Sequence, residues 1–175
     1  MKVVYAITER CINCHLCEVA CTTEHSRTKN PVSAYHVEGQ RFNWRESAPY
    51  PDPAEARDAG RPAPKSRCRV LQDGYRVIST MCRHCEVPSC VLACKNGSLY
   101  KDATGRVCVD EEKCVGCWMC IMACPYGVIT RNVDRQNVPQ VENNGINHHC
   151  DLCPDRNEPA CVRVCPTRAL VYEER

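Results

Sequence analysis

Sixteen of the chain's 18 cysteines fall into four groups that share nearly the same spacing. Each group begins with C-x-x-C and ends with C-x-x-x-C, and only the gap between these pairs varies, from two residues to seven. A C-x-x-C-x-x-C run turns tightly around one object and presents three thiols to it, which suits three corners of an iron–sulfur cubane. The four groups are I (Cys11, Cys14, Cys17, Cys21), II (Cys82, Cys85, Cys90, Cys94), III (Cys114, Cys117, Cys120, Cys124) and IV (Cys150, Cys153, Cys161, Cys165).

The composition favours metal over disulfides as the partner of these thiols. With one Phe in 175 residues and 6% aromatic residues, a conventional core is thin, and small cores are usually reinforced by disulfides or metals. The first residues lack the apolar core and cleavage site of a secretory signal, and no run approaches the ~18 apolar residues of a membrane span. We therefore expect a cytoplasmic protein, in a compartment where disulfides are rare.

Zinc is the main alternative metal. A structural zinc site joins two separated cysteine or histidine pairs into one tetrahedron, whereas each group here already holds four thiols. A zinc-stabilised interaction or nucleic-acid-binding module is therefore the alternative hypothesis. The formal charge is +2, but four clusters with thiolate ligands would bring it to about −6. That charge suits a basic partner surface and argues against nucleic acid.

Short β-patterned runs indicate which groups belong together. They occupy residues 3–7, 75–79, 106–110 and 169–173. In two-cluster ferredoxins the strand before the first motif lies beside the strand after the second, so the two terminal runs place group I with group IV. Groups II and III, only 19 residues apart, then form a second unit around a hairpin-like stretch at 99–110. The other pairing, I with II and III with IV, leaves the terminal strands without partners.

The sequence thus predicts an α+β fold of two nested bacterial-ferredoxin-like units with little regular secondary structure. Helices should be single turns after the cluster loops, as at 18–26 and 118–124. Residues 39–66 contain five prolines and should form an ordered arm that docks on a partner or covers a cluster, rather than a surface insertion. The expected divisions are 1–38 with 140–175 (outer unit), 39–66 (arm) and 67–139 (inner unit).

The fourth cysteine of each motif in a two-cluster ferredoxin ligates the cluster of the other motif. We therefore predict four 4Fe-4S clusters, each held by three cysteines of one group and the last cysteine of its partner group. The predicted ligand sets are Cys11, Cys14, Cys17 and Cys165 (cluster 1); Cys150, Cys153, Cys161 and Cys21 (cluster 2); Cys82, Cys85, Cys90 and Cys124 (cluster 3); and Cys114, Cys117, Cys120 and Cys94 (cluster 4).

A family resemblance rests on four segments: ERCINCHLCEVAC, CRHCEVPSCVLAC, DEEKCVGCWMCIMACPYG and CDLC with PACVRVCP. They resemble the four-cluster subunits of molybdenum- and tungsten-pterin oxidoreductases of the dimethyl sulfoxide reductase type. The length is closer to the short forms found with carbon monoxide dehydrogenase, formate dehydrogenase, hydrogenase or tungsten aldehyde oxidoreductase. The resemblance covers about 120 residues, leaving 22–66 largely outside. Thr22 and Lys95 stand where proline is usual, which should loosen the local turn.

The resemblance implies a non-catalytic electron-transfer subunit in a hetero-oligomer. Its partners would be a larger catalytic oxidoreductase subunit and a further acceptor, such as a flavoprotein, a ferredoxin or a membrane complex, without insertion of this chain into the membrane. No nucleotide-binding loop, Ser/His/Asp set or spare carboxylate pair indicates catalysis by the chain itself.

Several further residues lie close to the cysteine groups and have structural interpretations. Cys68 and Cys108 should be buried structural thiols, and His15 and His84 should pack or bond to sulfur inside the cluster loops. His148 and His149 should face solvent. Trp118 and Tyr126 should shield clusters from water. The cations beside ligands, either surface residues or charges that offset the clusters, are Arg83, Lys95, Arg163 and Arg168.

Overall fold

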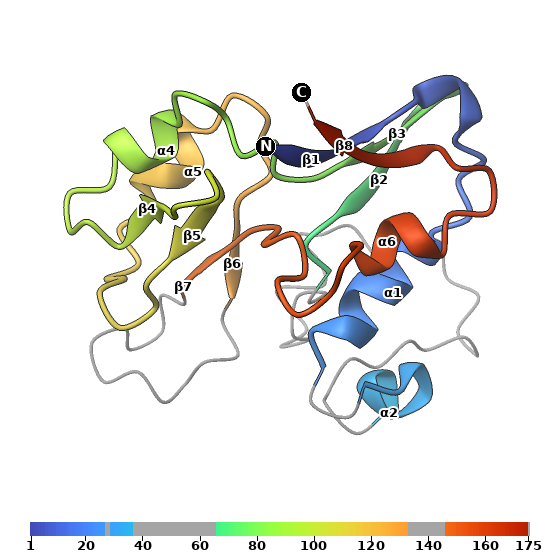
Figure 1. Cartoon of the computed structure of the whole chain (residues 1–175), viewed down its shortest axis with the longest axis horizontal. Helices are drawn as coiled ribbons and strands as arrows, with labels where there is room; N and C mark the ends of the chain where they lie inside the picture. Colours follow the sequence, from blue (N-terminus) through green and yellow to red (C-terminus); the bar gives the residue numbers. More distant parts are fainter. Residues whose placement is uncertain (27–28, 37–65, 133–145, 175) are drawn as a thin grey trace.

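The computed structural model describes residues 1–26, 29–36, 66–132 and 146–174 (Figure 1). This part of the chain is α+β, with short helices and two-stranded antiparallel sheets. Its elements are β1 (Lys2–Ala6), η1 (Thr8–Arg10), α1 (Leu16–Glu24), α2 (Pro31–His36), β2 (Arg69–Asp73), β3 (Arg76–Thr80), α4 (Ser89–Leu92), β4 (Leu99–Lys101), β5 (Val107–Val109), α5 (Met119–Ala123), β6 (Thr130–Asn132), β7 (Ile146–His148), α6 (Ala160–Arg163) and β8 (Leu170–Glu174).

The two ends of the chain lie side by side. β1 pairs antiparallel with β8, in a register that sets Lys2 opposite Glu174 and Ala6 opposite Leu170. This confirms the predicted pairing of the terminal strands. Val4 and Leu170 are almost fully buried and belong to the main apolar cluster, which also contains several cysteines. The sheet is therefore held by a core that is shared with the thiols.

The outer lobe, on the right of Figure 1, is built on this sheet from β1, β8, η1, α1, α6 and the β2–β3 hairpin. Helix α1, which follows the first cysteines of group I, packs against α6 of group IV. β3 lies against β1 and η1. Residues 69–80, which the sequence analysis assigned to the inner unit, therefore contact the outer lobe.

The inner lobe, on the left of Figure 1, consists of α4, α5, β4 and β5. Helices α4 and α5 of groups II and III pack together, and β4 pairs with β5 as the predicted hairpin. The Asp102 carboxylate closes that hairpin by accepting hydrogen bonds from the Thr104 and Arg106 backbone N–H groups, both at 2.9 Å. Such local side-chain bonds are typical of turns that begin with Asp.

Some elements differ from the sequence-based expectations. Helix α1 has nine residues rather than a single turn, because Thr22, unlike proline, can continue a helix. Helix α2, strand β2 and the β6–β7 pair were not predicted. Most of the expected arm at 39–66 lies outside the described residues. Within the described residues, no helix is long and apolar enough to cross a membrane.

Candidate iron–sulfur site

The four cysteine loops share one backbone feature. The residue just before the second cysteine of each group has a positive φ: 58° at Asn13, 46° at His84, 65° at Gly116 and 62° at Leu152. Non-glycine residues rarely adopt this left-handed conformation, and asparagine and histidine tolerate it better than most. Its recurrence at one position of all four groups means that each loop bends in the same way around its cysteines.

Group I and group IV meet at a hollow of about 340 Å³ that opens to solvent. Its walls are almost wholly apolar and include Val70 and Leu170. The cysteines that line it are Cys11, Cys14, Cys17 and Cys165. Three thiols of one group thus face the last thiol of the partner group, which is the set predicted for cluster 1.

A second hollow, of about 410 Å³, lies between groups II and III in the inner lobe. Leu99, Val107 and Val128 contribute apolar walls. Its cysteines are Cys82, Cys85, Cys90 and Cys124. Here too, three thiols of one group and the last thiol of the next line one space.

The remaining ligand sets are brought together to different degrees. In the outer lobe Cys21, Cys150 and Cys161 belong to one buried cluster, and the Cys153 thiol interacts with Cys21 and Cys161. In the inner lobe Cys120 interacts with Cys114. Cys94 lies just after α4, which packs on α5, the helix that holds Cys120.

N–H groups point at several of these sulfur atoms. The backbone N–H groups of Arg67, Ala169, Leu99 and His84 donate to sulfur over 3.2–3.5 Å. The first three of these donors reach the last cysteine of a group, at Cys21, Cys165 and Cys94 respectively. Hydrogen bonds to ligand sulfurs stabilise negative charge on them and raise the reduction potential of an iron–sulfur centre.

The burial of the thiols decides what can bind there. Burial raises the pKa of Cys82 and of Cys153 to about 12, and it also raises the pKa values of Cys90, Cys120 and Cys150. These groups become thiolates at neutral pH only when cations neutralise them, because an unpaired buried charge is strongly disfavoured. Apolar hollows lined by four thiols fit a 4Fe-4S cluster, in which iron provides the positive charge that thiolates need.

The two cysteines outside the groups differ. Cys68 is only 2% exposed, and its thiol is hydrogen-bonded with Cys161, Cys17 and Cys21. The hydrogen bond from Cys68 is the main reason why the pKa of Cys17 falls to about 7. Cys108 is only partly buried, with its sulfur 3.7 Å from the Asp102 carboxylate. Burial is therefore confirmed for Cys68 but is incomplete for Cys108, because β5 lies at an open edge of a two-stranded sheet.

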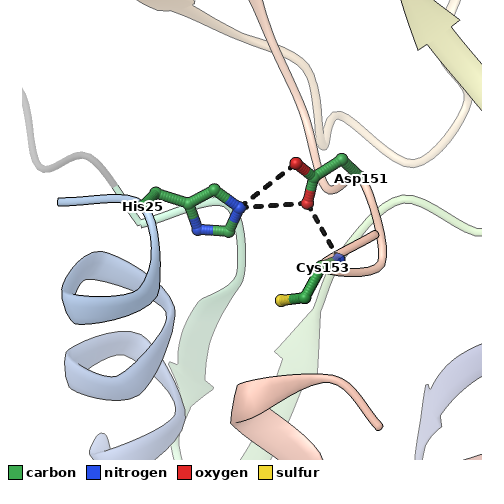
Figure 2. Close-up of side chains that lie close together, drawn as sticks. All are labelled: His25, Asp151 and Cys153. Carbon is green, nitrogen blue, oxygen red and sulfur yellow. Dashed lines mark hydrogen bonds and ion pairs between the residues drawn. The ribbon is translucent and has the colours of Figure 1, made fainter. Parts of the chain in front are cut away.

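His25, Asp151 and Cys153 form a group that sequence reasoning missed (Figure 2). Their ligand atoms lie within 4.8 Å of one another, a spacing that could hold a metal ion. Figure 2 shows, however, that the carboxylate contacts the backbone nitrogen of Cys153, at 3.0 Å, and not its sulfur. The Nε2 atom of His25 lies 3.0 Å from the carboxylate, which also forms an ion pair with Arg67. The guanidinium of Arg67 supplies the positive charge beside Asp151 that a metal ion would otherwise bring. We therefore interpret the group as a polar clamp that joins two segments of the chain.

The clamp holds the group IV loop against the end of α1. His25 Nδ1 lies 2.7 Å from the carbonyl oxygen of Cys21, so both ring nitrogens face acceptors. Burial lowers the pKa of His25, but the hydrogen bonds to Asp151 and Cys21 outweigh it and raise the pKa to about 9. Although burial raises the pKa of Asp151, the hydrogen bond from His25 and the charge of Arg67 bring it below its usual range.

His148 and His149 do not face solvent as predicted; they are 8% and 5% exposed. His148 is the last residue of β7, which pairs with β6 (Figure 1), and His149 follows it directly. Polar partners compensate their burial: His148 Nε2 accepts a hydrogen bond from Arg67 Nε at 3.3 Å, and His149 Nδ1 lies 2.5 Å from Oδ1 of Asn147. Burial lowers the pKa of His148 to about 3.

The other histidines inside cluster loops act as packing and hydrogen-bonding residues. His84 is buried, and its Nδ1 accepts the N–H of Val107 at 3.0 Å. Burial is also the main reason that the pKa of His84 falls to about 4. His15 is partly exposed and lies 2.9 Å from Glu18. Neither side chain replaces a cysteine.

The aromatic residues near group III pair with arginines. The Arg83 guanidinium lies 4.2 Å from the Tyr126 ring centroid, and that of Arg131 lies 4.7 Å from Trp118. Arg83 and Tyr126 both line the hollow of group II, so the pair sets a positive charge at its wall. Lys95, Arg163 and Arg168 are exposed. A backbone hydrogen bond of 3.3 Å from Gly97 to the Cys94 carbonyl closes the turn after Cys94, and one of equal length closes the turn after Cys124. Lys95 in place of proline therefore does not loosen this turn.

Comparison with known proteins places these features in a family. Residues 74–175 match the model of the 4Fe-4S dicluster domain, and residues 8–24 match that of a 4Fe-4S binding domain. The chain is 33% identical to an iron–sulfur protein of Rhodospirillum rubrum, over 96% of this chain and 80% of that protein. It is 31% identical to the electron transport protein HydN of Escherichia coli, over 99% and 89%. It is 41% identical to the B subunit of the anaerobic dimethyl sulfoxide reductase of Escherichia coli, over 54% and 44%.

Proposed function

The chain belongs to the 4Fe-4S dicluster domain family and is a ferredoxin-like iron–sulfur electron-transfer subunit; from this premise we propose that it carries four clusters. They lie in two nested ferredoxin-like units and link a larger catalytic redox subunit to a further acceptor. The chain itself does not catalyse the reaction of its partner.

The observation that carries the proposal is the crosswise composition of the two cysteine-lined hollows. Each combines three thiols of one group with the last thiol of its partner, I with IV and II with III. The pairing of β1 with β8 and the packing of α1 on α6 and of α4 on α5 support the same grouping. We propose that the sixteen cysteines are ligands in the four sets given above.

The chain's own residues bind the clusters, exclude water and set their potentials. Each 4Fe-4S cluster, when bound, accepts and releases one electron. Buried walls such as Leu99 and Leu170 shield the inner side of each hollow from solvent, while N–H groups stabilise charge on the sulfurs. Cys14 and Cys117, the second cysteines of groups I and III, are the two exposed members of the sixteen. They lie in different lobes, so electrons can enter through one and leave through the other.

For the catalytic partner we propose a molybdenum- or tungsten-pterin oxidoreductase or a carbon monoxide dehydrogenase. One relative is named as a subunit of an anaerobic dimethyl sulfoxide reductase, and another as an electron transport protein. The acceptor would be a flavoprotein, a ferredoxin or a membrane complex. We propose the cytoplasm as the location, because free thiols persist in a reducing compartment.

The test is to isolate the native complex anaerobically through this chain and to measure its metals by mass spectrometry. We expect about sixteen irons per copy beyond those of the partner. Molybdenum or tungsten would identify a pterin oxidoreductase as partner, and nickel a carbon monoxide dehydrogenase or hydrogenase. Stoichiometric zinc with little iron and no brown colour would overturn the proposal in favour of a zinc-stabilised module.

A further inference from the structure

Asn147, a side chain outside the cysteine groups, points at a proposed ligand. Its Nδ2 atom donates a hydrogen bond to the sulfur of Cys120 at 3.2 Å. Asn147 is 3% exposed and comes from β7, the strand that leads into group IV, whereas Cys120 belongs to group III. The backbone donors described above reach sulfur at similar distances, so this contact is as close as those.

The amide is held in one orientation. Its Oδ1 atom lies 2.5 Å from Nδ1 of His149, and Nε2 of that ring lies 3.0 Å from the carbonyl oxygen of Val107 in β5. A thiolate bound to iron is only an acceptor, so the amide presents its NH₂ group to the sulfur and accepts with its oxygen from Nδ1–H of His149. Burial keeps the ring neutral, so its Nε2 carries no proton to donate to Val107. The hydrogen bonds therefore run from His149, in the segment that precedes group IV, through Asn147 to the sulfur of Cys120.

We infer that Asn147 is a positioning residue that raises the reduction potential of the group III cluster. In this way the segment before group IV influences the reduction potential of a cluster in the inner lobe. This inference rests on the proposed function, because it requires Cys120 to be a cluster ligand. It adds a residue that belongs to neither the ligand set nor the cysteine loops.

The direction follows from charge. Reduction adds an electron to the cluster and its thiolates, so sulfur becomes a stronger acceptor. A fixed N–H donor then stabilises the reduced form more than the oxidised form, and the low dielectric of a buried site increases the difference. Loss of the donor should shift the reduction equilibrium of this cluster about tenfold towards the oxidised form, which is about 59 mV for one electron.

The experiment uses the anaerobically purified, cluster-loaded full chain and titrates its clusters by EPR at controlled potentials. Asn147→Leu keeps the approximate size but removes the donor. Thr130→Val is the matched control, because Thr130 lies on the neighbouring strand and bonds to His148 but not to sulfur. We expect one lower potential in Asn147→Leu, three unchanged potentials, and four unchanged potentials in Thr130→Val. In a Cys94→Ser background, which removes the group III cluster, the Asn147 substitution should shift nothing.

Equal potentials in Asn147→Leu and the unaltered chain would overturn the inference, as would a shift of all four clusters or the same shift in the threonine control. A second measurement needs no variant: with ¹⁵N placed only in asparagine side chains, pulsed EPR of the reduced chain should detect a coupled amide nitrogen. Its absence counts against the inference. The iron content distinguishes failure of this inference from failure of the proposed function. About sixteen irons per chain without these effects would reject only the role of Asn147, whereas a chain without clusters would reject the proposed function as well.

Discussion

Exchange of the last cysteines between groups is the most specific consequence of the proposed nested arrangement. Cys124→Ser should release the cluster of group II, although the substitution lies in group III, because Cys124 lines the hollow of group II. Cys94→Ser should do the reverse and release the cluster of group III. In each variant the iron content should fall from about sixteen to about twelve atoms per chain if one whole cluster is lost.

The assay is brief anaerobic alkylation of the folded variants at pH 8, followed by peptide mass spectrometry. The structure sets which freed thiols react. Burial raises the pKa of Cys82 to about 12, so only about one Cys82 side chain in ten thousand is a thiolate at pH 8. Labelling in Cys124→Ser should therefore appear at the less buried Cys85 and Cys90. In Cys94→Ser it should appear first at Cys117, which is exposed.

The control is Cys108→Ser, which removes a thiol outside the four groups and should leave every group protected. Labelling of Cys114, Cys117 and Cys120 in Cys124→Ser, with group II protected, would mean that each group binds its own cluster and would refute the exchange. Labelling of group I in Cys94→Ser would instead favour the pairing of group I with group II.

Three further predictions concern the same site. Cys68→Ser and Cys108→Ser should each retain about sixteen irons by elemental analysis, because neither thiol belongs to the proposed ligand sets; a loss of about four irons in either would contradict the sixteen-ligand assignment. Gly116→Ala should cost about 1 kcal/mol at a φ of 65° and shorten the half-life of the group III cluster with a chelator about fivefold, and an unchanged half-life would argue against strain there. Removal of iron should abolish most far-UV circular dichroism, since we propose that the clusters form much of the core; a retained spectrum would show that the chain folds without them.

The parts of the site that could be predicted from the sequence are those that depend on the spacing of nearby residues. The interval between Cys14 and Cys17, repeated between Cys117 and Cys120, leaves the backbone few ways to present its thiols. Similarly, the predicted hairpin at 99–110 contains two short β-patterned runs joined by a turn that Asp102 closes. The pairing of β4 with β5 confirms it. These features depend on residues within about ten positions of one another.

Contacts between distant segments were harder to foresee. The expected exposure of His148 and His149 was wrong because β7 pairs with β6 across residues 133–145, a stretch without a strand pattern. The β2–β3 hairpin lies against β1 although it precedes group II directly, because β1 offers an apolar face to it. Cys68 likewise meets Cys17 and Cys161 only through folding.

The sequence by itself determined the cofactor chemistry, since four repeats of closely spaced thiols suit iron–sulfur cubanes better than zinc or disulfides. It also determined that the two ends of the chain pair, because strand patterns flank the first and last groups. Only the tertiary structure decided which side chains reach the sulfurs, such as Asn147 at Cys120 and Cys68 at Cys17. The physical reason is that a ligand loop is fixed by spacing along the chain, whereas the polar groups around a buried sulfur come from segments tens of residues away and are placed by packing.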